Sequence, residues 1–288
     1  MKIALIGAAG QLGSDIERAN LKFNFEIIPL THADLDVTNF NISYKVLKEI
    51  MPEVIINTAA FHKVDDCEKE PDKAYSVNTL GVRNIGVISN ELNSSIVHIS
   101  TDYIFDGKKE NKTVGYSEFD TPNPINIYGM SKLQGERVLT TVTNKYYIIR
   151  TAWLFGYGGS KAKGGNFVKT MLNLSKQRHE LKVINDQIGT PTNTYYLAYQ
   201  ILELINYPYF GTYHATCEGM TSWYYYALEI FKQAGININV IPISSNEYRT
   251  EAKRPSFSAL ENKMLKLQNI NIMPGWDEAL AEYLKHIL

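Results

Sequence analysis

The alternation of short apolar runs with helical segments is the feature that most constrains how this chain can fold. Residues with helical spacing follow the first two apolar runs, at 11–19 and 42–50. The runs themselves occupy residues 3–6, 25–30, 54–57, 96–100 and 146–150. Continuous apolar runs are typical of strands covered on both faces, and their alternation with helices is typical of a parallel sheet. We therefore predict an α/β fold with a Rossmann-type, doubly wound parallel sheet, which binds ligands at the C-terminal ends of its strands.

The pattern becomes less regular after Arg150, which indicates a second unit. Helical spacing reappears at 166–176 and 276–286, while the polar stretch 106–126 is expected to be a loop flanking the site. Two units joined by more than one crossing of the chain explain this order most simply. We predict a dinucleotide-binding domain at 1–152 plus roughly 182–212, and a smaller C-terminal α/β substrate-binding lobe at roughly 153–181 and 213–288.

Composition excludes several classes of protein. With 44% apolar and 20% charged residues in 288, the chain can bury a sizeable core, and its net charge of -1 gives no reason to expect nucleic acid or a membrane as partner. Cys67 and Cys217 lie far apart, which suits a reducing compartment, and no run of residues reads as a signal peptide or membrane span. We expect a cytoplasmic protein. The acidic residues form no recognisable ligand cluster, so we predict no metal.

A glycine turn joins the first apolar run to the first helical segment. Such a turn places backbone N–H groups and the positive end of a helix where a pyrophosphate can bind. The spacing is GxxGxxG rather than GxGxxG, and a tight turn used only for packing is the alternative. The residues predicted to bind a dinucleotide here are Gly7, Gly10, Gln11, Leu12 and Gly13.

The second apolar run ends in Thr31-His32, with no acidic residue at its tip. An NAD-selective site often places a carboxylate there on the adenosine ribose, so its absence favours NADPH, with NADH still possible. Asp36 and Val37 lie close by and are candidates to frame the adenine. Asp36 could equally cap the helix that follows.

The third apolar run leads into Ala59 and Ala60. Two small side chains at the end of a strand permit the close approach of a planar ribose or nicotinamide, so we include both in the predicted cofactor site. Packing alone would also explain them.

A Tyr-Lys pair and a strand-ending threonine carry the predicted chemistry. Tyr128 and Lys132 are four residues apart and share a helix face, and Thr101 directly follows the run 96–100. A phenol is a poor acid near neutral pH, but a neighbouring ammonium stabilises its phenolate and brings the proton into use. We predict that the Thr101 hydroxyl bonds the reacting carbonyl oxygen while a dinucleotide supplies hydride. A buried tyrosine beside a solvated lysine is the alternative for this pair.

These motifs together resemble the extended short-chain dehydrogenase/reductase superfamily. The motif after the fourth run is Ser100-Thr101-Asp102-Tyr103-Ile104-Phe105-Asp106-Gly107. Four later segments narrow the resemblance to the dTDP-4-dehydrorhamnose reductase family, and they are 150–156, 165–168, 186–192 and 254–260. The resemblance implies reduction of the 4-keto group of dTDP-4-dehydro-L-rhamnose by NAD(P)H, which completes dTDP-L-rhamnose for cell-surface polysaccharide. Tyr128 is then the proton donor, and Lys132 also holds the nicotinamide ribose.

The resemblance implies further site residues, and each has a structural alternative. Asn78 is expected to support the lysine, although it could simply begin a helix, and both Asn78 and Ser100 join the predicted cofactor site. The residues expected to contact the nucleotide sugar are Tyr103, Trp153, Asn166, Gln187 and Arg254. Of these, Arg254 has a fork that matches a diphosphate, whereas Tyr103 and Trp153 could be core aromatics.

Two segments depart from the pattern of the resembled family. Phe257 stands where that family commonly has asparagine, which puts one hydrogen bond in doubt. The pair His62-Lys63 differs from the usual Thr-Ala-Val-Asp pattern, and these side chains either contact substrate or are simply solvated.

Other functions remain open at this stage. A relative of the family is a non-catalytic, NADP-binding regulatory subunit of methionine adenosyltransferase, and other nucleotide-keto-sugar reductases, epimerases and dehydratases share the Tyr-Lys pair. The intact set of Thr101, Tyr128 and Lys132 favours catalysis. A homodimer is a possible assembly.

Overall fold

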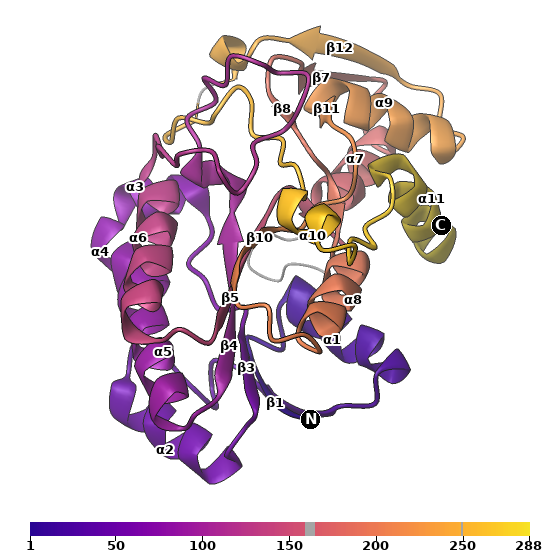
Figure 1. Cartoon of the computed structure of the whole chain (residues 1–288). Helices are drawn as coiled ribbons and strands as arrows, with labels where there is room; N and C mark the ends of the chain where they lie inside the picture. Colours follow the sequence, from indigo (N-terminus) through magenta and orange to yellow (C-terminus); the bar gives the residue numbers. More distant parts are fainter. Residues whose placement is uncertain (159–164, 249) are drawn as a thin grey trace.

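The computed structural model describes residues 1–158, 165–248 and 250–288. Within them, a parallel sheet has the strand order β10-β5-β4-β3-β1-β2 (Figure 1). Its strands are β1 (Lys2–Ile6), β2 (Glu26–Leu30), β3 (Val54–Asn57), β4 (Ser95–Thr101), β5 (Tyr146–Thr151) and β10 (Gly211–His214). The chain runs from β1 outward to β2, then returns to β3 on the other side, so the strand order reverses beside β1. The predicted doubly wound α/β fold is confirmed, and its switch point lies between β1 and β3.

Helices cover both faces of this sheet (Figure 1). On one face lie α2 (Phe40–Ile50), α5 (Val82–Glu91) and α6 (Ile127–Val142), and on the other lie α1 (Gln11–Ala19) and α8 (Thr194–Leu204). Asparagine caps fix where three of them begin, since Asn39 accepts from the Ile42 N–H, Asn126 from the Gly129 N–H and Asn193 from the Tyr195 N–H. Between β3 and α5 the chain forms α3 (Val64–Lys69), α4 (Pro71–Tyr75) and a π-helical turn (Ser76–Gly81).

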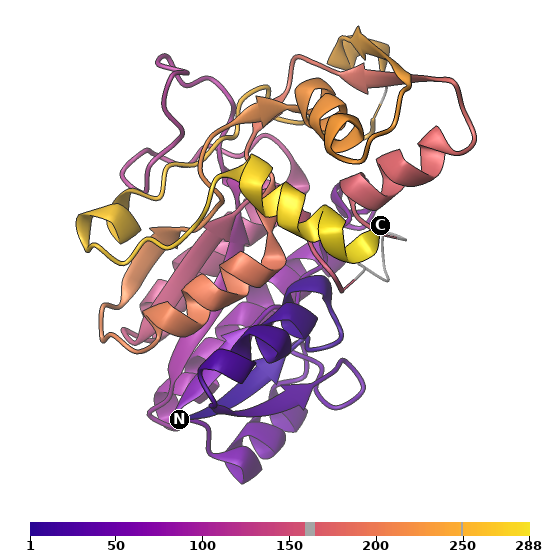
Figure 2. The same cartoon turned by 90° about the vertical axis from the view of Figure 1, so that its right-hand side faces the viewer.

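The remaining elements form a second layer beyond the C-terminal ends of the strands (Figures 1 and 2). Its paired strands are β7 (Glu180–Ile184) with β12 (Asn239–Ile243), β8 (Ile188–Gly189) with β11 (Thr221–Ser222), and β6 (Leu154–Phe155) with β9 (Thr192–Asn193). Its helices are α7 (Phe167–Ser175), α9 (Trp223–Gln233), α10 (Lys263–Leu267) and α11 (Trp276–Ile287). Short 3-10 turns occur at Asn20–Lys22, Asp102–Ile104 and Ser245–Glu247.

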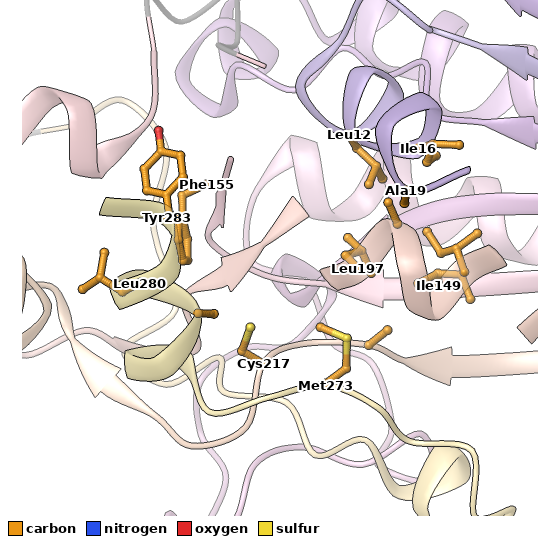
Figure 3. Packing of buried hydrophobic residues seen from close by; sticks show 14 of the residues in the cluster. Leu12, Ile16, Ala19, Ile149, Phe155, Leu197, Cys217, Met273, Leu280 and Tyr283 are labelled. Carbon is orange, nitrogen blue, oxygen red and sulfur yellow. The ribbon is translucent and has the colours of Figure 1, made fainter. Parts of the chain in front are cut away.

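The proposed division into two domains stays a prediction. Its boundary near residue 182 falls inside β7, and the one near 212 falls inside β10. Residues 159–164 of the predicted lobe lie outside the described residues. One apolar cluster is continuous across both parts, because Leu12 and Ile16 of α1 share it with Leu280 of α11 (Figure 3).

The polar segment 106–126 carries no helix or strand in the described structure, as expected. It is nevertheless anchored, because the Tyr116 ring stacks on Phe105 with centroids 4.1 Å apart and its backbone forms a bridge with Leu260. No helix among the described residues is long and apolar enough to cross a membrane.

Candidate active site

The glycine turn after β1 forms a cradle that side chains would fill. Gly7 has a φ of 81°, and a Cβ there would lie 2.5 Å from the Thr58 hydroxyl oxygen. A Cβ on Gly13 would lie 2.5 Å from the Gly7 carbonyl oxygen, so glycine is needed for the helix to approach the turn this closely. Gly10 is the N-cap of α1, so no capping side chain bonds the first N–H groups of this helix. The cradle therefore fits a dinucleotide pyrophosphate bound by backbone N–H groups.

An acidic group lies at the end of β2, where the sequence analysis expected none. The Thr31 N–H and hydroxyl donate to Asp34 Oδ2 at 2.8 and 2.7 Å, and the Thr31 hydroxyl holds the pKa of Asp34 below its usual value. The carboxylate folds back from a turn three residues on, so inspection of the strand tip alone missed it. A carboxylate here suits the 2′-hydroxyl of an adenosine ribose and opposes a 2′-phosphate.

Asp36 and Val37 lie just beyond, as part of the same crossover. Asp36 Oδ1 accepts from the Thr38 N–H at 2.9 Å and from the Thr38 hydroxyl at 2.8 Å, so it fixes its own turn and does not cap α2. Val37 is buried against Gly81 of the π-helical turn. Their role in framing an adenine stays a prediction.

Asn78 ties the end of β3 to α6. It is fully buried in the π-helical turn; its Oδ1 accepts from the Phe61 N–H at 2.9 Å, and its Nδ2 donates to the Phe61 carbonyl at 2.9 Å and to the Ser131 hydroxyl at 3.0 Å. Ala59 and Ala60 are half-buried on the segment that Asn78 holds. Asn78 thus contacts the chain neighbour of Lys132. Its predicted place in the cofactor site stays a prediction.

Thr101 and Tyr128 meet at the end of β4. Their hydroxyls are hydrogen-bonded, and Thr101 Oγ1 also lies 3.1 Å from Asp102 Oδ1. Tyr128 stands on the first turn of α6 and keeps a partly exposed face. Burial of the phenol is the main reason why its pKa is raised, so Tyr128 holds its proton at neutral pH. The structure therefore brings the two predicted hydroxyls together at one point.

Lys132 lies one turn along α6 and is buried. Its ammonium donates to the Ile99 carbonyl at 2.6 Å and lies 3.3 Å from His98 Nε2. Burial lowers the pKa of Lys132 from 10.5 to about 8, against the carboxylate of Glu136, which raises it. The ammonium is therefore charged at neutral pH, although it is held inside the protein at a desolvation cost.

A buried ion pair between Arg150 and Glu136 lies near this lysine, and the Glu136 carboxylate favours its charged form. Arg150 bonds Glu136 through Nη2 at 2.8 Å and Nε at 3.1 Å, and the Ser100 hydroxyl donates to the same carboxylate. Ser100 is thus engaged with Glu136, and its predicted cofactor contact stays untested. Sequence reasoning missed Glu136, although Tyr128, Lys132 and Glu136 repeat every four residues on one helix face.

Two of the predicted sugar contacts lie beside Tyr128. The Tyr103 ring packs edge-on against the Tyr128 ring, with centroids 5.8 Å apart, and its hydroxyl is hydrogen-bonded to Arg254. Arg254 also forms a bidentate pair with Asp65, at 2.8 and 3.2 Å. The fork predicted to bind a diphosphate is therefore already held by a carboxylate that sequence reasoning did not single out.

Trp153 is a strained aromatic residue between the two parts of the chain. It has a φ of 45° and stacks on Trp223 with ring centroids 3.4 Å apart. Gly189 makes room for its ring, because any Cβ there would overlap the indole. Backbone strain of this kind persists only where the surroundings impose it, and it often marks a functional site.

Gln187 and Asn166 are both buried in the C-terminal layer. Asn166 caps α7 by accepting from the Lys169 N–H at 3.0 Å, and its Nδ2 donates to the Tyr283 hydroxyl at 3.1 Å and to the Gly156 carbonyl at 3.2 Å. These bonds occupy both ends of its amide, which favours a structural role. Contact of either residue with a nucleotide stays a prediction.

The two departures from the resembled pattern have plain structural settings. Phe257 is buried in an apolar cluster with Phe105 and Tyr116, so packing replaces the polar contact expected there. Lys63 is exposed and pairs with Asp66 at 3.6 Å, which fits a solvated side chain. Among the described residues, no group of three or more His, Cys, Asp or Glu side chains is placed to hold a metal ion.

Comparison with known proteins agrees with this geometry. A family model described as the RmlD substrate binding domain matches residues 1–288. The spore coat polysaccharide biosynthesis protein SpsK of Bacillus subtilis (strain 168) is 38% identical over 285 residues, which cover 99% of this chain and 97% of that protein.

Solved structures give the same result. A dTDP-4-dehydrorhamnose reductase from Clostridium acetobutylicum ATCC 824 is 44% identical with a TM-score of 0.94, over 100% of this chain and 99% of that one. Another from Bacillus anthracis str. Ames, in complex with NADP, is 41% identical with a TM-score of 0.94, over 99% of each chain. The fold and the glycine cradle define a dinucleotide-binding Rossmann protein. Within that class, the chain belongs to the RmlD substrate binding domain family.

The burial of Lys132 predicts a gain in stability when its charge is removed. Because its pKa is about 8 when folded and 10.5 in the unfolded chain, the unfolded state binds more protons between these values. The free energy of unfolding should therefore rise with pH from about 8 to 10.5. Below about pH 8 the protein carries the full destabilisation caused by burying the charged ammonium. Lys132→Met should raise the free energy of unfolding at neutral pH by about 2 kcal/mol and remove this rise.

Urea denaturation across this pH range measures both effects. Lys69→Met, at an exposed position on α3, is the matched control and should change stability by less than about 0.5 kcal/mol. A Lys132→Met variant that is less stable than the wild type would show that the ammonium is net stabilising.

Proposed function

We propose that this protein reduces the 4-keto group of dTDP-4-dehydro-L-rhamnose to give dTDP-L-rhamnose, with NADPH as the hydride donor and NADH as a possible substitute. The observation that carries the proposal is the pair of bonded hydroxyls of Thr101 and Tyr128 at the end of β4, one turn from the buried ammonium of Lys132. The relatives named dTDP-4-dehydrorhamnose reductase, similar over nearly the whole chain, support this choice of substrate.

The cofactor would lie across the switch point between β1 and β3. The N–H groups of the first turn of α1, Gln11 to Gly13, would hold its pyrophosphate, because those of Gly7 and Gly10 already donate to backbone carbonyls. Ala59 and Ala60 leave room for the nicotinamide half. When bound, the dinucleotide supplies a hydride to the carbonyl carbon. The NADP in the Bacillus anthracis reductase supports this choice of cofactor.

The chain's own residues would manage the proton. As the carbonyl oxygen gains negative charge, Tyr128 donates its proton to it, and the charge on Lys132 favours the phenolate that forms. Thr101 orients the Tyr128 hydroxyl and lies where it also contacts the reacting oxygen. Because burial raises the pKa of Tyr128, Tyr128 begins each cycle protonated, as a general acid must be.

The nucleotide sugar would bind between the end of β4 and the C-terminal layer. Tyr103 and Trp153 would offer aromatic faces to a pyranose. Arg254 would bind the diphosphate with donors that its pair with Asp65 leaves available. Gln187 and Asn166 complete the proposed nucleotide side. Cys67 and Cys217 are both buried cysteines, which supports a cytoplasmic setting, and a homodimer stays a prediction.

Tyr128→Phe tests the proton donor. Loss of the hydroxyl should lower kcat for NADPH oxidation with dTDP-4-dehydro-L-rhamnose by roughly 10²- to 10⁴-fold while leaving NADPH binding nearly unchanged. Tyr147→Phe is the matched control, because the hydroxyl of this buried tyrosine on β5 donates to the Tyr207 carbonyl, and its activity should stay near the wild-type value. A Tyr128→Phe variant with wild-type kcat would rule out the assigned role.

Asp34→Asn tests the acidic group at the end of β2. Removal of its charge should raise kcat/KM for NADPH relative to NADH by roughly fivefold, because a carboxylate repels a 2′-phosphate at that position. Asp72→Asn, exposed on α4, should leave this ratio unchanged. An unchanged ratio in Asp34→Asn would place the ribose elsewhere.

A further inference from the structure

Asp102 is a buried carboxyl beside Tyr128 that the proposed function does not yet use. It begins the 3-10 turn after β4 and is 3% exposed. Its Oδ1 lies 3.1 Å from the Thr101 hydroxyl oxygen, whereas its Oδ2 is buried with no hydrogen-bond partner among the described residues. An ionised carboxylate left half-unpaired in the interior is costly, so this group requires an explanation.

The surroundings of Asp102 favour its neutral form. Burial raises its pKa to about 7, although the hydroxyls of Ser258 and Thr101 act in the opposite direction. A carboxyl with this pKa keeps its proton in a large share of molecules near neutral pH. Unlike a carboxylate, the protonated acid can donate a hydrogen bond.

Thr101 joins this acid to the proposed proton donor. Its hydroxyl oxygen is within hydrogen-bond distance of Asp102 Oδ1 and is hydrogen-bonded to the Tyr128 hydroxyl. A hydroxyl accepts one hydrogen bond while it donates another, and its proton rotates to suit. Asp102, Thr101 and Tyr128 therefore form a continuous chain of exchangeable protons that runs from the interior to the partly exposed face of Tyr128.

We propose that Asp102 returns a proton to Tyr128 through the Thr101 hydroxyl each time Tyr128 protonates the reduced carbonyl oxygen. The relay rests on the proposed function, because that reaction is what removes the Tyr128 proton. Its atoms balance in three linked steps. The Tyr128 O–H bond breaks as the product hydroxyl forms, the Thr101 O–H bond breaks as Tyr128 is reprotonated, and the Asp102 O–H bond breaks as Thr101 is reprotonated. Once the product leaves, the Asp102 carboxylate regains a proton from hydronium or a buffer acid in the solvent, which keeps the conjugate base.

The electrostatics around Tyr128 show why reprotonation of its phenolate is useful. Burial, with Asp102, Cys67 and Tyr103, raises the pKa of Tyr128, so a phenolate left at this position is unfavourable. A proton supplied from Asp102 removes that phenolate. The other titratable or charged groups that face the relay are Tyr103 on the same turn, Cys67 on α3, and Arg254 with Asp65 beyond Tyr103.

Asp102→Asn tests the relay, since the amide keeps the shape and loses the acid. We would measure kcat and KM with dTDP-4-dehydro-L-rhamnose from about pH 5.5 to 9. The wild-type kcat should fall as pH rises through about 7, because the protonated acid is the active form. Asp102→Asn should lower kcat roughly 100-fold at low pH and keep KM within about twofold. Its kcat should show no fall near pH 7. Only the fall above about pH 8, caused by deprotonation of Lys132, should remain.

Two further variants separate a relay from a structural role. Asp106→Asn makes the same change in a hydrogen-bonded carboxylate four residues on, and it should behave as the wild type does. Ser258→Ala removes a hydroxyl that favours ionised Asp102, so the pKa of Asp102 should rise. The fall of kcat in this variant should therefore occur at higher pH, while kcat at low pH stays at the wild-type value. This variant keeps the proposal testable even where Asp102→Asn folds poorly.

Three results would overturn the relay. One is an Asp102→Asn variant with kcat within about twofold of the wild type at low pH. Another is an Asp102→Asn variant that loses activity but whose kcat still falls near pH 7 as that of the wild type does. A third is a variant whose defect lies in KM alone, which would make Asp102 a substrate contact.

An infrared titration tests the relay without turnover. The difference between wild type and Asp102→Asn should contain a carboxylic acid C=O band that disappears as pH rises through about 7. A wild type that does not reduce the keto-sugar would overturn the proposed function, whereas this band would still report the proton on Asp102. Absence of the band at about pH 6 would overturn the relay.

Discussion

The site depends on how closely α6 packs against the end of β4 and the π-helical turn. Any Cβ on Gly129 would overlap the Tyr103 carbonyl, and any Cβ on Gly135 would overlap the Asn78 carbonyl. Glycine at these two points lets the helix backbone lie directly on its neighbours. This packing sets Tyr128 against Thr101 and places Lys132 under the strand end, so the chemistry follows from a backbone contact.

The same packing commits the protein to burying charge. Lys132, Glu136 and Arg150 are all buried, and the ammonium of Lys132 is satisfied by a backbone carbonyl. Buried charges of this kind cost stability unless they are fully paired, and active sites often accept that cost in exchange for a shifted pKa. Here the shift brings the pKa of Lys132 to about 8, close to physiological pH, where a small change in its surroundings alters its charge.

Local patterns were enough to predict the sheet and the catalytic pair. The apolar runs located β1, β3 and β5, and the four-residue spacing placed Tyr128 and Lys132 on one face of α6, because both signals lie within single elements. Side-chain contacts that depend on a turn or on distant parts of the chain could not be predicted in this way. Asp65 reaches Arg254 across the fold, and Asp34 folds back onto Thr31 from a turn, so both carboxylates were missed. The side chains of Asn166 and Asp36 form hydrogen bonds within the protein, and their predicted ligand contacts stay predictions.

The central claim is that hydride passes from a dinucleotide at the β1–β3 switch point to the C4 carbonyl of a nucleotide sugar held at the end of β4. The most direct measurement uses NADPH deuterated at C4 of the nicotinamide, with each face labelled in turn, and locates the label in the product by NMR. We expect deuterium at C4 of dTDP-L-rhamnose from one face of the cofactor only, with NADP⁺ released in equal amount. Product without deuterium from either face, or cofactor that stays reduced, would contradict it.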